Sequence, residues 1–229
     1  MLRFYGQAKF SLNAEKDLPI GYELFIREQQ GERWVLPEDF TSSTAAEIGD
    51  LLERTIAMMP DNIKIVSFNL EQSQFIDPEF CETVARVQAG TDIKIYTELT
   101  ERTSPNVSAQ SLHDAARNFH EHNLLVCIDD VGTGDNTPEF VMDVDAYIDE
   151  YKFALQNFRP FTHISELQDK IAFWWSLANA KGKLLAIEGI ENAEDLEVVR
   201  SKYPCDIIQG YYVGRPMLLP IQGETTTAI

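Results

Sequence analysis

Apolar residues in this chain fall into short runs that alternate with longer segments of helical spacing. Eight short runs predict strands, within residues 3–10, 20–26, 63–70, 93–99, 124–130, 146–153, 184–190 and 205–211. Six amphipathic segments predict helices, within residues 44–59, 77–88, 108–122, 137–144, 166–180 and 193–203. After the first two strands, strand and helix therefore alternate to the last predicted strand.

This order of elements predicts the fold. Alternation of strand and helix is typical of a parallel sheet, and eight strand candidates indicate a TIM-like (β/α)8 barrel. The stretch LNAEKDLP, residues 12–19, separates the first two strands and is a turn rather than a crossover helix. It permits only a hairpin, so we expect the first strand, near residues 4–10, to be antiparallel to the second.

The 229 residues suffice for one such domain, and no linker rich in Pro, Gly or Ser divides them. We expect the domain to cover residues 1–220, followed by a C-terminal tail at 221–229 with little to bury. Three cysteines, Cys81, Cys127 and Cys205, lie far apart in apolar segments, which favours small core residues over a disulfide or zinc site.

Charge and hydropathy narrow the functional classes. A formal net charge of −18 argues against binding of polymeric nucleic acid, which depends on clusters of Lys and Arg. No stretch has the length of a membrane span, and the first ten residues do not resemble a signal peptide. We therefore expect a cytoplasmic protein without a membrane partner.

Polar residues recur at the ends of the predicted strands, where active sites of such barrels lie. Adjacent carboxylates at Asp129 and Asp130 end an apolar run, and burying them requires a compensating cation or hydrogen-bond donor, although a solvated turn would explain this pair taken alone. Matching groups at the other strand ends are Glu23, Arg27, Asn69, Glu98, Glu101, Lys152, Glu188, Glu191 and Gln209. Oxygen ligands without Cys or His suit Mg²⁺ or Mn²⁺, and paired aspartates can bridge two ions.

Seven stretches together resemble a known family. YELFIRE, SFNLEQSQF, YTELTE, CIDDVGTG, EYKFA, AIEGIE and IIQGYYVGRP are similar in order and spacing to the motifs of EAL-domain phosphodiesterases, which hydrolyse cyclic di-GMP. The resemblance covers roughly residues 4–216. It implies a metal-dependent phosphodiesterase that converts cyclic di-GMP to linear pGpG.

The resemblance also implies roles for individual residues. Metal ligands would be Glu23, Asn69, Glu98 and Asp129, with Asp130 serving a second ion. Lys152 and Glu188 would surround the attacking water, so that Lys152, Glu188 and Asp130 form the catalytic set. Arg27, Leu24 and Gln209 would contact the substrate, and Glu101 and Glu191 would support the loop after the paired aspartates unless they are ordinary solvated glutamates.

Three departures from the family pattern leave a second hypothesis open. The name-giving triplet is Glu23-Leu24-Phe25, Val131 replaces an aromatic residue after the aspartates, and Ala154 replaces a carboxylate near the second ion. The alternative to an enzyme is a weakened domain that acts as a cyclic di-GMP receptor or a protein-interaction module.

Partners beyond the substrate are less defined. Trp174 and Trp175 lie in an apolar helix, where packing on the barrel is the simpler reading and a homodimer face is the alternative. No cyclase-type sequence accompanies the domain, so a regulatory protein partner is also open.

Overall fold

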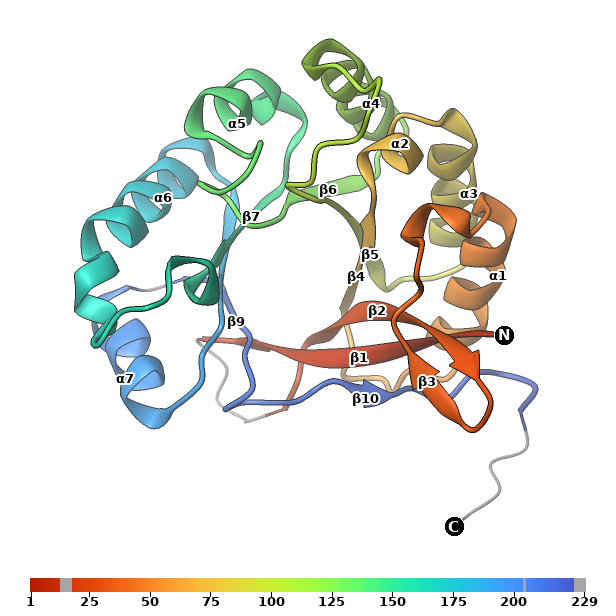
Figure 1. Ribbon diagram of the computed structural model, residues 1–229, viewed down its shortest axis with the longest axis horizontal. Coiled ribbons are helices and arrows are strands. Elements are labelled where there is room, and N and C mark those ends of the chain that lie inside the picture. Colours follow the sequence, from red (N-terminus) through yellow and green to blue (C-terminus); the bar gives the residue numbers. More distant parts are fainter. Residues whose placement is uncertain (13–17, 204, 225–229) are drawn as a thin grey trace.

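Eight strands close into a barrel in the computed structural model, which describes residues 1–12, 18–203 and 205–224. Figure 1 shows these strands as a ring with helices around all of it except the side of β1 and β10. The ring closes because β1 pairs with β2 on one side and with β9 on the other. The barrel strands are β1 (Leu2–Ser11), β2 (Gly21–Gln30), β4 (Ile65–Leu70), β5 (Lys94–Leu99), β6 (Leu125–Ile128), β7 (Glu150–Ala154), β8 (Leu184–Glu188) and β9 (Ile207–Ile208).

The predicted direction of the first strand is confirmed. β1 is antiparallel to β2, in a register that runs from Leu2 opposite Glu28 to Lys9 opposite Gly21. The other adjacent pairs from β2 to β9 are parallel. The predicted turn lies mostly outside the described residues, because residues 13–17 are not among them.

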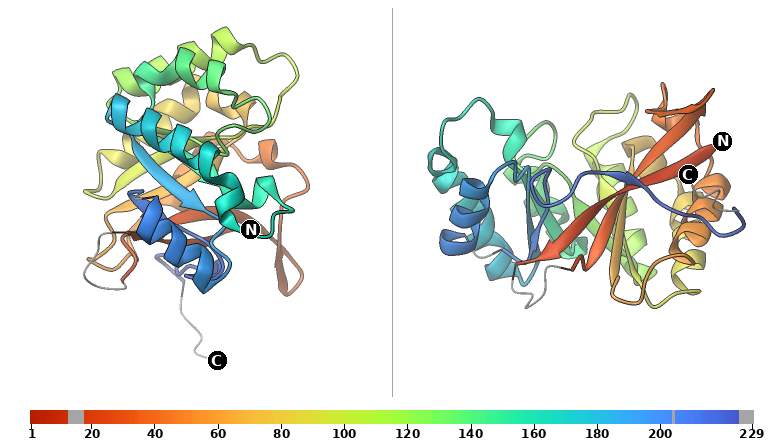
Figure 2. Two further views of the ribbon diagram at one scale, coloured as in Figure 1. Left: turned by 90° about the vertical axis from the view of Figure 1, so that its left-hand side faces the viewer. Right: turned by 90° about the horizontal axis from the view of Figure 1, so that it is seen from below.

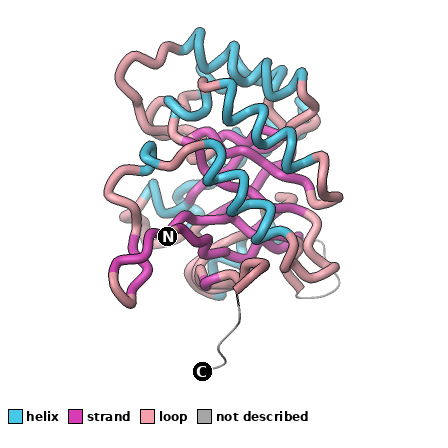
Figure 3. Tube along the Cα trace, turned by 90° about the vertical axis from the view of Figure 1, so that its right-hand side faces the viewer, coloured by secondary structure: helices cyan, strands magenta, loops and turns pink. Residues whose placement is uncertain are grey.

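Helices pack along the outside of the strands, as Figure 3 shows. They are α1 (Ala45–Ile56), α2 (Gln72–Phe75), α3 (Pro78–Gln88), α4 (Ala109–Glu121), α5 (Pro138–Val144), α6 (Gln168–Lys181) and α7 (Ala193–Lys202). Short 3-10 helices lie at Phe40–Ser42, Asp145–Tyr147, Leu155–Phe158 and Ile164–Leu167. The side chains of Asp77 and Asn192 cap α3 and α7 by accepting backbone N–H groups of the first turn.

Some predicted boundaries were wrong. The strand expected within residues 146–153 begins only at Glu150, because Asp145–Tyr147 form a 3-10 helix, and β9 spans two residues. Two short strands were not predicted, β3 (Arg33–Val35), which forms a hairpin with β2, and β10 (Met217–Leu218), which pairs with β1.

The C-terminal segment crosses the barrel on the side of β1. Seen from below in Figure 2, β1 and β2 run across this face with the segment that carries β10 beside them. Ile221 is only 3% exposed, and Glu224 forms an ion pair with Arg3. Packing therefore continues past residue 220, and the division into a domain and a tail there remains a prediction.

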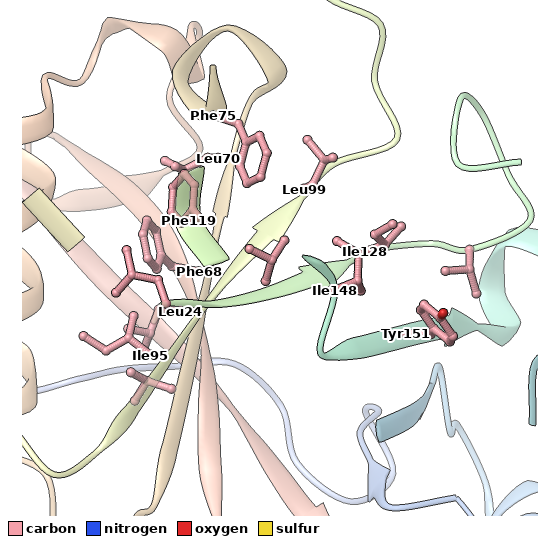
Figure 4. Close-up of a cluster of buried hydrophobic side chains, with 14 of the residues drawn as sticks. Leu24, Phe68, Leu70, Phe75, Ile95, Leu99, Phe119, Ile128, Ile148 and Tyr151 are labelled. Carbon is pink, nitrogen blue, oxygen red and sulfur yellow. The ribbon is translucent and has the colours of Figure 1, made fainter. Parts of the chain in front are cut away.

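The apolar core lies between the strands and the helices. Figure 4 shows side chains of the strands, including Phe68 and Leu99, beside Phe75 and Phe119 of the helices. The rings of Phe75 and Phe119 stack with their centroids 4.8 Å apart. All three cysteines are buried, as expected of small core residues. Among the described helices, none has the length and apolar character needed to cross a membrane.

Candidate active site at the carboxyl ends of the strands

A buried ammonium group lies at the centre of four carboxylates. Nζ of Lys152, on β7, is 2.7 Å from Oε2 of Glu98, 2.9 Å from Oδ1 of Asp129, 2.9 Å from Oε1 of Glu188 and 3.3 Å from Oε2 of Glu23. These partners come from β5, the end of β6, β8 and β2. The structure thus brings together five residues that the sequence analysis assigned to strand ends.

Strand alternation directs these side chains inward. Tyr151 and Phe153 of β7 point outward, since their rings pack on Trp174 of α6 and on Phe158. Glu150 and Lys152 alternate with them and therefore face the barrel interior. Lys152 has no exposed surface, so its charge depends entirely on the surrounding carboxylates.

Burial and mutual repulsion shift the carboxyl pKa values apart. Burial, reinforced by Glu98, raises the pKa of Glu23 to about 7. Burial also raises the pKa of Asp129 to about 7 against the opposing effect of Lys152, and it raises the pKa of Glu188 well above its usual value. At Glu98 burial opposes ionisation, but Lys152 and Lys9 outweigh it and lower the pKa to about 2. Such divergence is typical of functional sites.

A second buried lysine was missed by the sequence analysis. Nζ of Lys9, on β1, lies 3.1 Å from Oε1 of Glu98 and 3.8 Å from Oε1 of Glu150. Lys9 and Glu150 are 1% and 0% exposed. The alternation of Lys9 with apolar neighbours is also the pattern of a half-exposed strand, and only the closure of the barrel places this position inside.

Amide side chains orient Glu23. Nε2 of Gln209 donates to Oε2 of Glu23 at 2.5 Å, and Nδ2 of Asn69 donates to its Oε1 at 3.2 Å. Oδ1 of Asn69 is buried, and no described residue donates a hydrogen bond to it. A buried amide oxygen that lacks a donor is a suitable ligand for a cation.

The paired aspartates occupy a tight turn. Asp130 has a φ of 50°, and Oγ1 of Thr133 donates to its carbonyl oxygen at 2.6 Å. Nδ2 of Asn136 donates to the carbonyl oxygen of Asp129 at 2.5 Å. A Cβ atom at Gly134, whose φ is 49°, would lie 2.8 Å from the carbonyl oxygen of Glu101. Glu101 therefore lies against this loop, and its support role remains a prediction.

The donor set fits divalent cations. Carboxylate oxygens of Glu23, Glu98 and Asp129 lie within 4.8 Å of one another, and so do those of Glu101, Asp129 and Asp130. The ammonium groups of Lys152 and Lys9 supply two positive charges. The site contains more carboxyl groups than these two charges can neutralise. Clustered hard oxygen ligands with excess negative charge are the chemistry that Mg²⁺ and Mn²⁺ bind.

Two hollows meet at these carboxylates. One, of about 370 Å³, extends past Glu188, Gln209 and Tyr211, and the other, of about 220 Å³, extends past Leu24, Arg27, Asn69, Phe40 and Arg102. Both are lined by Glu23, Phe25, Asp129 and Asp130. The aromatic residues Phe40 and Tyr211 in these walls were not predicted as site residues.

The other predicted site residues line one of the two hollows, and each has its own contacts. The guanidinium of Arg27 lies over the ring of Tyr5, 5.4 Å from its centroid. Leu24 is 1% exposed, and Gln209 reaches Glu23 as described above. Glu191 lines the larger hollow but forms an ion pair with Arg159 at 3.1 Å, and none of its described contacts is with the loop after the aspartates.

Comparison with known proteins identifies the family of the chain. The EAL domain model matches residues 9–216. The chain is 23% identical over 227 residues to the cyclic di-GMP phosphodiesterase PdeL of Escherichia coli strain K12, with 89% of this chain covered. It spans only 60% of PdeL.

Solved structures share the fold. The PaMucR phosphodiesterase in its c-di-GMP complex matches with a TM-score of 0.74 at 20% identity, covering 94% of this chain and 92% of the other. The Bacillus subtilis YkuI protein, which has an EAL domain and was solved with substrate c-di-GMP and calcium, matches with a TM-score of 0.72 at 18% identity, covering 97% and 57%. The family match spans most of the chain, and the chain therefore belongs to the EAL domain family.

Proposed function

We propose that this chain is a phosphodiesterase that hydrolyses cyclic di-GMP to linear pGpG with Mg²⁺ or Mn²⁺. The observation that carries the proposal is the convergence of four carboxylates on Lys152, two of which, Glu23 and Asp129, line both hollows. The names of PdeL and PaMucR, both called phosphodiesterases, support the same activity.

The two hollows suit a cyclic dinucleotide. Such a ligand carries one base on each side of its phosphodiester ring, and the carboxylates lie between the hollows. Tyr211 in one hollow and Phe40 in the other offer rings on which a base can stack. Arg27, which lines the second hollow, would contact a phosphate, and Gln209 and Leu24 would form part of the walls.

The carboxylates would hold the cations in two adjoining sites. Glu23, Asn69, Glu98 and Asp129 would bind one ion. Asp130 would bind a second with Asp129, and the carboxylate of Glu101 lies within reach of both. Divalent cations bound there would neutralise charge on the scissile phosphate and lower the pKa of an adjacent water molecule.

Lys152 and Glu188 would supply charge stabilisation and proton transfer. Burial tends to lower the pKa of Lys152, but Asp129 and the other carboxylates around it raise it well above its usual value, so its ammonium stays protonated. Lys152 therefore stabilises negative charge and does not act as a base. Glu188 has a raised pKa beside this ammonium and would accept a proton from the attacking water.

One observation favours the receptor alternative. Ala154 ends β7 opposite Glu188 in the register, at the position where the family pattern has a carboxylate. Its side chain offers no ligand to a second ion, so a domain that binds cyclic di-GMP without turnover is the second candidate function.

A comparison of binding with turnover separates the two candidates. The wild type and Glu188→Gln should both bind cyclic di-GMP in a calorimetric titration with Ca²⁺. With Mn²⁺, the wild type should release pGpG and Glu188→Gln should not, because the substitution removes the proton acceptor and retains the shape. Equal binding with no product from either protein would favour the receptor.

A further inference from the structure

Glu98 is held from both sides by buried ammonium groups. Lys152 lies 2.7 Å from its Oε2, and Lys9 lies 3.1 Å from its Oε1. Each oxygen therefore has its own partner, and the plane of the carboxylate is fixed by two contacts instead of one. Lys9, Glu98 and Lys152 come from β1, β5 and β7, so the contacts cross the barrel interior.

Lys9 is placed too deep to touch a substrate. It is 1% exposed, and it lines neither of the two hollows. Lys152 is equally buried but pairs with carboxylates that line the hollows, whereas neither described ion pair of Lys9 is with a residue that lines them. The described contacts of its ammonium group are with Glu98 and with Glu150, at 3.1 Å and 3.8 Å. Its effect on chemistry must therefore pass through one of these carboxylates.

The distances favour Glu98 over Glu150 as the functional partner. The Lys9–Glu98 distance is that of a charge-assisted hydrogen bond, whereas 3.8 Å to Glu150 is an electrostatic contact only. No described residue gives either oxygen of Glu150 a hydrogen bond. Without Lys9, Lys152 would be the one ammonium group still within hydrogen-bond distance of Glu98 among the described residues, and Oε1 of Glu98 would lose its charged partner.

We propose that Lys9 is a positioning residue that orients the Glu98 carboxylate toward Lys152 and toward the cation site that Glu98 would form with Glu23 and Asp129. Residues that fix a metal ligand from behind in this way affect metal affinity or activity by roughly 10–100-fold. The inference rests on the proposed function, because it assigns Lys9 to the cation site of that reaction.

The test must separate positioning from simple charge balance. Lys9→Met alone leaves Glu98 and Glu150 short of a cation and is expected to be unstable. The informative protein is therefore the double variant Lys9→Met/Glu150→Gln, which removes one positive and one negative charge together. Its matched control is Glu150→Gln, which keeps the Lys9–Glu98 contact.

The readouts are Mn²⁺ affinity by calorimetry without substrate, melting temperature, and kcat and KM for cyclic di-GMP. We expect the double variant to bind Mn²⁺ about tenfold or more weakly than Glu150→Gln and to have a lower kcat with an unchanged KM. Lys9→Arg/Glu150→Gln, which restores a donor to Glu98, should recover part of the Mn²⁺ affinity at a similar melting temperature.

Two results would overturn the inference. If the double variant matches Glu150→Gln in Mn²⁺ affinity and kcat, Lys9 serves charge balance alone and the proposed function stands. If the wild type neither binds Mn²⁺ nor cleaves cyclic di-GMP, the proposed function fails and the inference fails with it.

Discussion

Nζ of Lys152, on β7, lies 2.9 Å from Oε1 of Glu188, on the neighbouring strand β8, and both side chains are buried. Burial raises the pKa of Glu188, whereas Lys152 favours its ionised form. Because these two effects oppose each other, the carboxyl group of Glu188 can take up a proton and release it again. The proposed reaction requires this of a general base.

Asp130→Asn should abolish turnover and leave the fold intact. The substitution keeps the size of the side chain but removes a negative charge from the group formed with Glu101 and Asp129. We expect kcat to fall by about 10² or more, the scale seen when one preorganised electrostatic group is lost. Release of pGpG measures the effect and the far-UV circular dichroism spectrum controls for folding; near-normal turnover would remove Asp130 from the mechanism.

The fold could be predicted because strand and helix periodicities were strong and the first connection was short. The antiparallel β1 followed from the turn at residues 12–19, even though most of that turn lies outside the described part of the chain. The error at the start of β7 arose because residues 146–149 continue the apolar pattern of the strand, whereas Asp145–Tyr147 form a 3-10 helix.

Site residues at the ends of strands were easier to predict than those buried deeper in the barrel. Glu98, Asp129 and Glu188 follow apolar runs, so their placement at the ends of β5, β6 and β8 could be foreseen, whereas Glu23 is the third residue of β2. Lys9 and Glu150 lie within strands, and only the closed barrel shows that the two face each other at 3.8 Å. The roles of all these residues in catalysis remain predictions.

Cation binding should tighten as pH rises through about 7. Burial raises the pKa values of Glu23 and Asp129 to about 7, so protons compete with the cation at lower pH. Calorimetric titrations with Mn²⁺ at several pH values should show this change together with proton release. An affinity independent of pH between about 6 and 8 would contradict the raised pKa values.

The same two carboxyl groups should make the metal-free protein less stable at higher pH. Their folded-state pKa values of about 7 lie above ordinary carboxyl values, so the folded protein binds more protons than the unfolded chain. Their contribution to stability is present below about pH 4 and is lost as pH rises through about 7. Chemical denaturation with a chelator present measures this trend, and a contribution that grows over that range would have the wrong sign.

Ala154→Asp should lower the divalent cation concentration needed for turnover if a carboxylate at the end of β7 can reach the second ion. Ala154 is 1% exposed and stands opposite Glu188, so the new group would add charge to an already acidic site. The test is to measure the hydrolysis rate of the wild type and of Ala154→Asp as a function of Mg²⁺ and Mn²⁺ concentration. An unchanged or higher requirement would contradict this role of position 154, and any low turnover would then be attributed to the loop that follows Asp130.

Asn136→Ala should destabilise that loop. Asn136 is 1% exposed, and its amide donates to the carbonyl oxygen of Asp129. Removing a buried donor leaves this carbonyl without its partner, at a cost of about 1–3 kcal/mol in the free energy of unfolding. Denaturant unfolding measures that loss, and Mn²⁺ titration should show weaker binding. Wild-type values in both would mean that Asn136 does not hold the aspartates in place.

The most direct test of the central claim is hydrolysis of cyclic di-GMP by the purified protein with Mn²⁺ in water labelled with heavy oxygen. If Glu23, Asp129, Lys152 and Glu188 support attack of water on one phosphodiester bond, mass spectrometry will find pGpG with one heavy oxygen atom on its terminal phosphate. A chelator will prevent the product from forming. Recovery of intact cyclic di-GMP from the Mn²⁺ reaction after prolonged incubation would contradict the account.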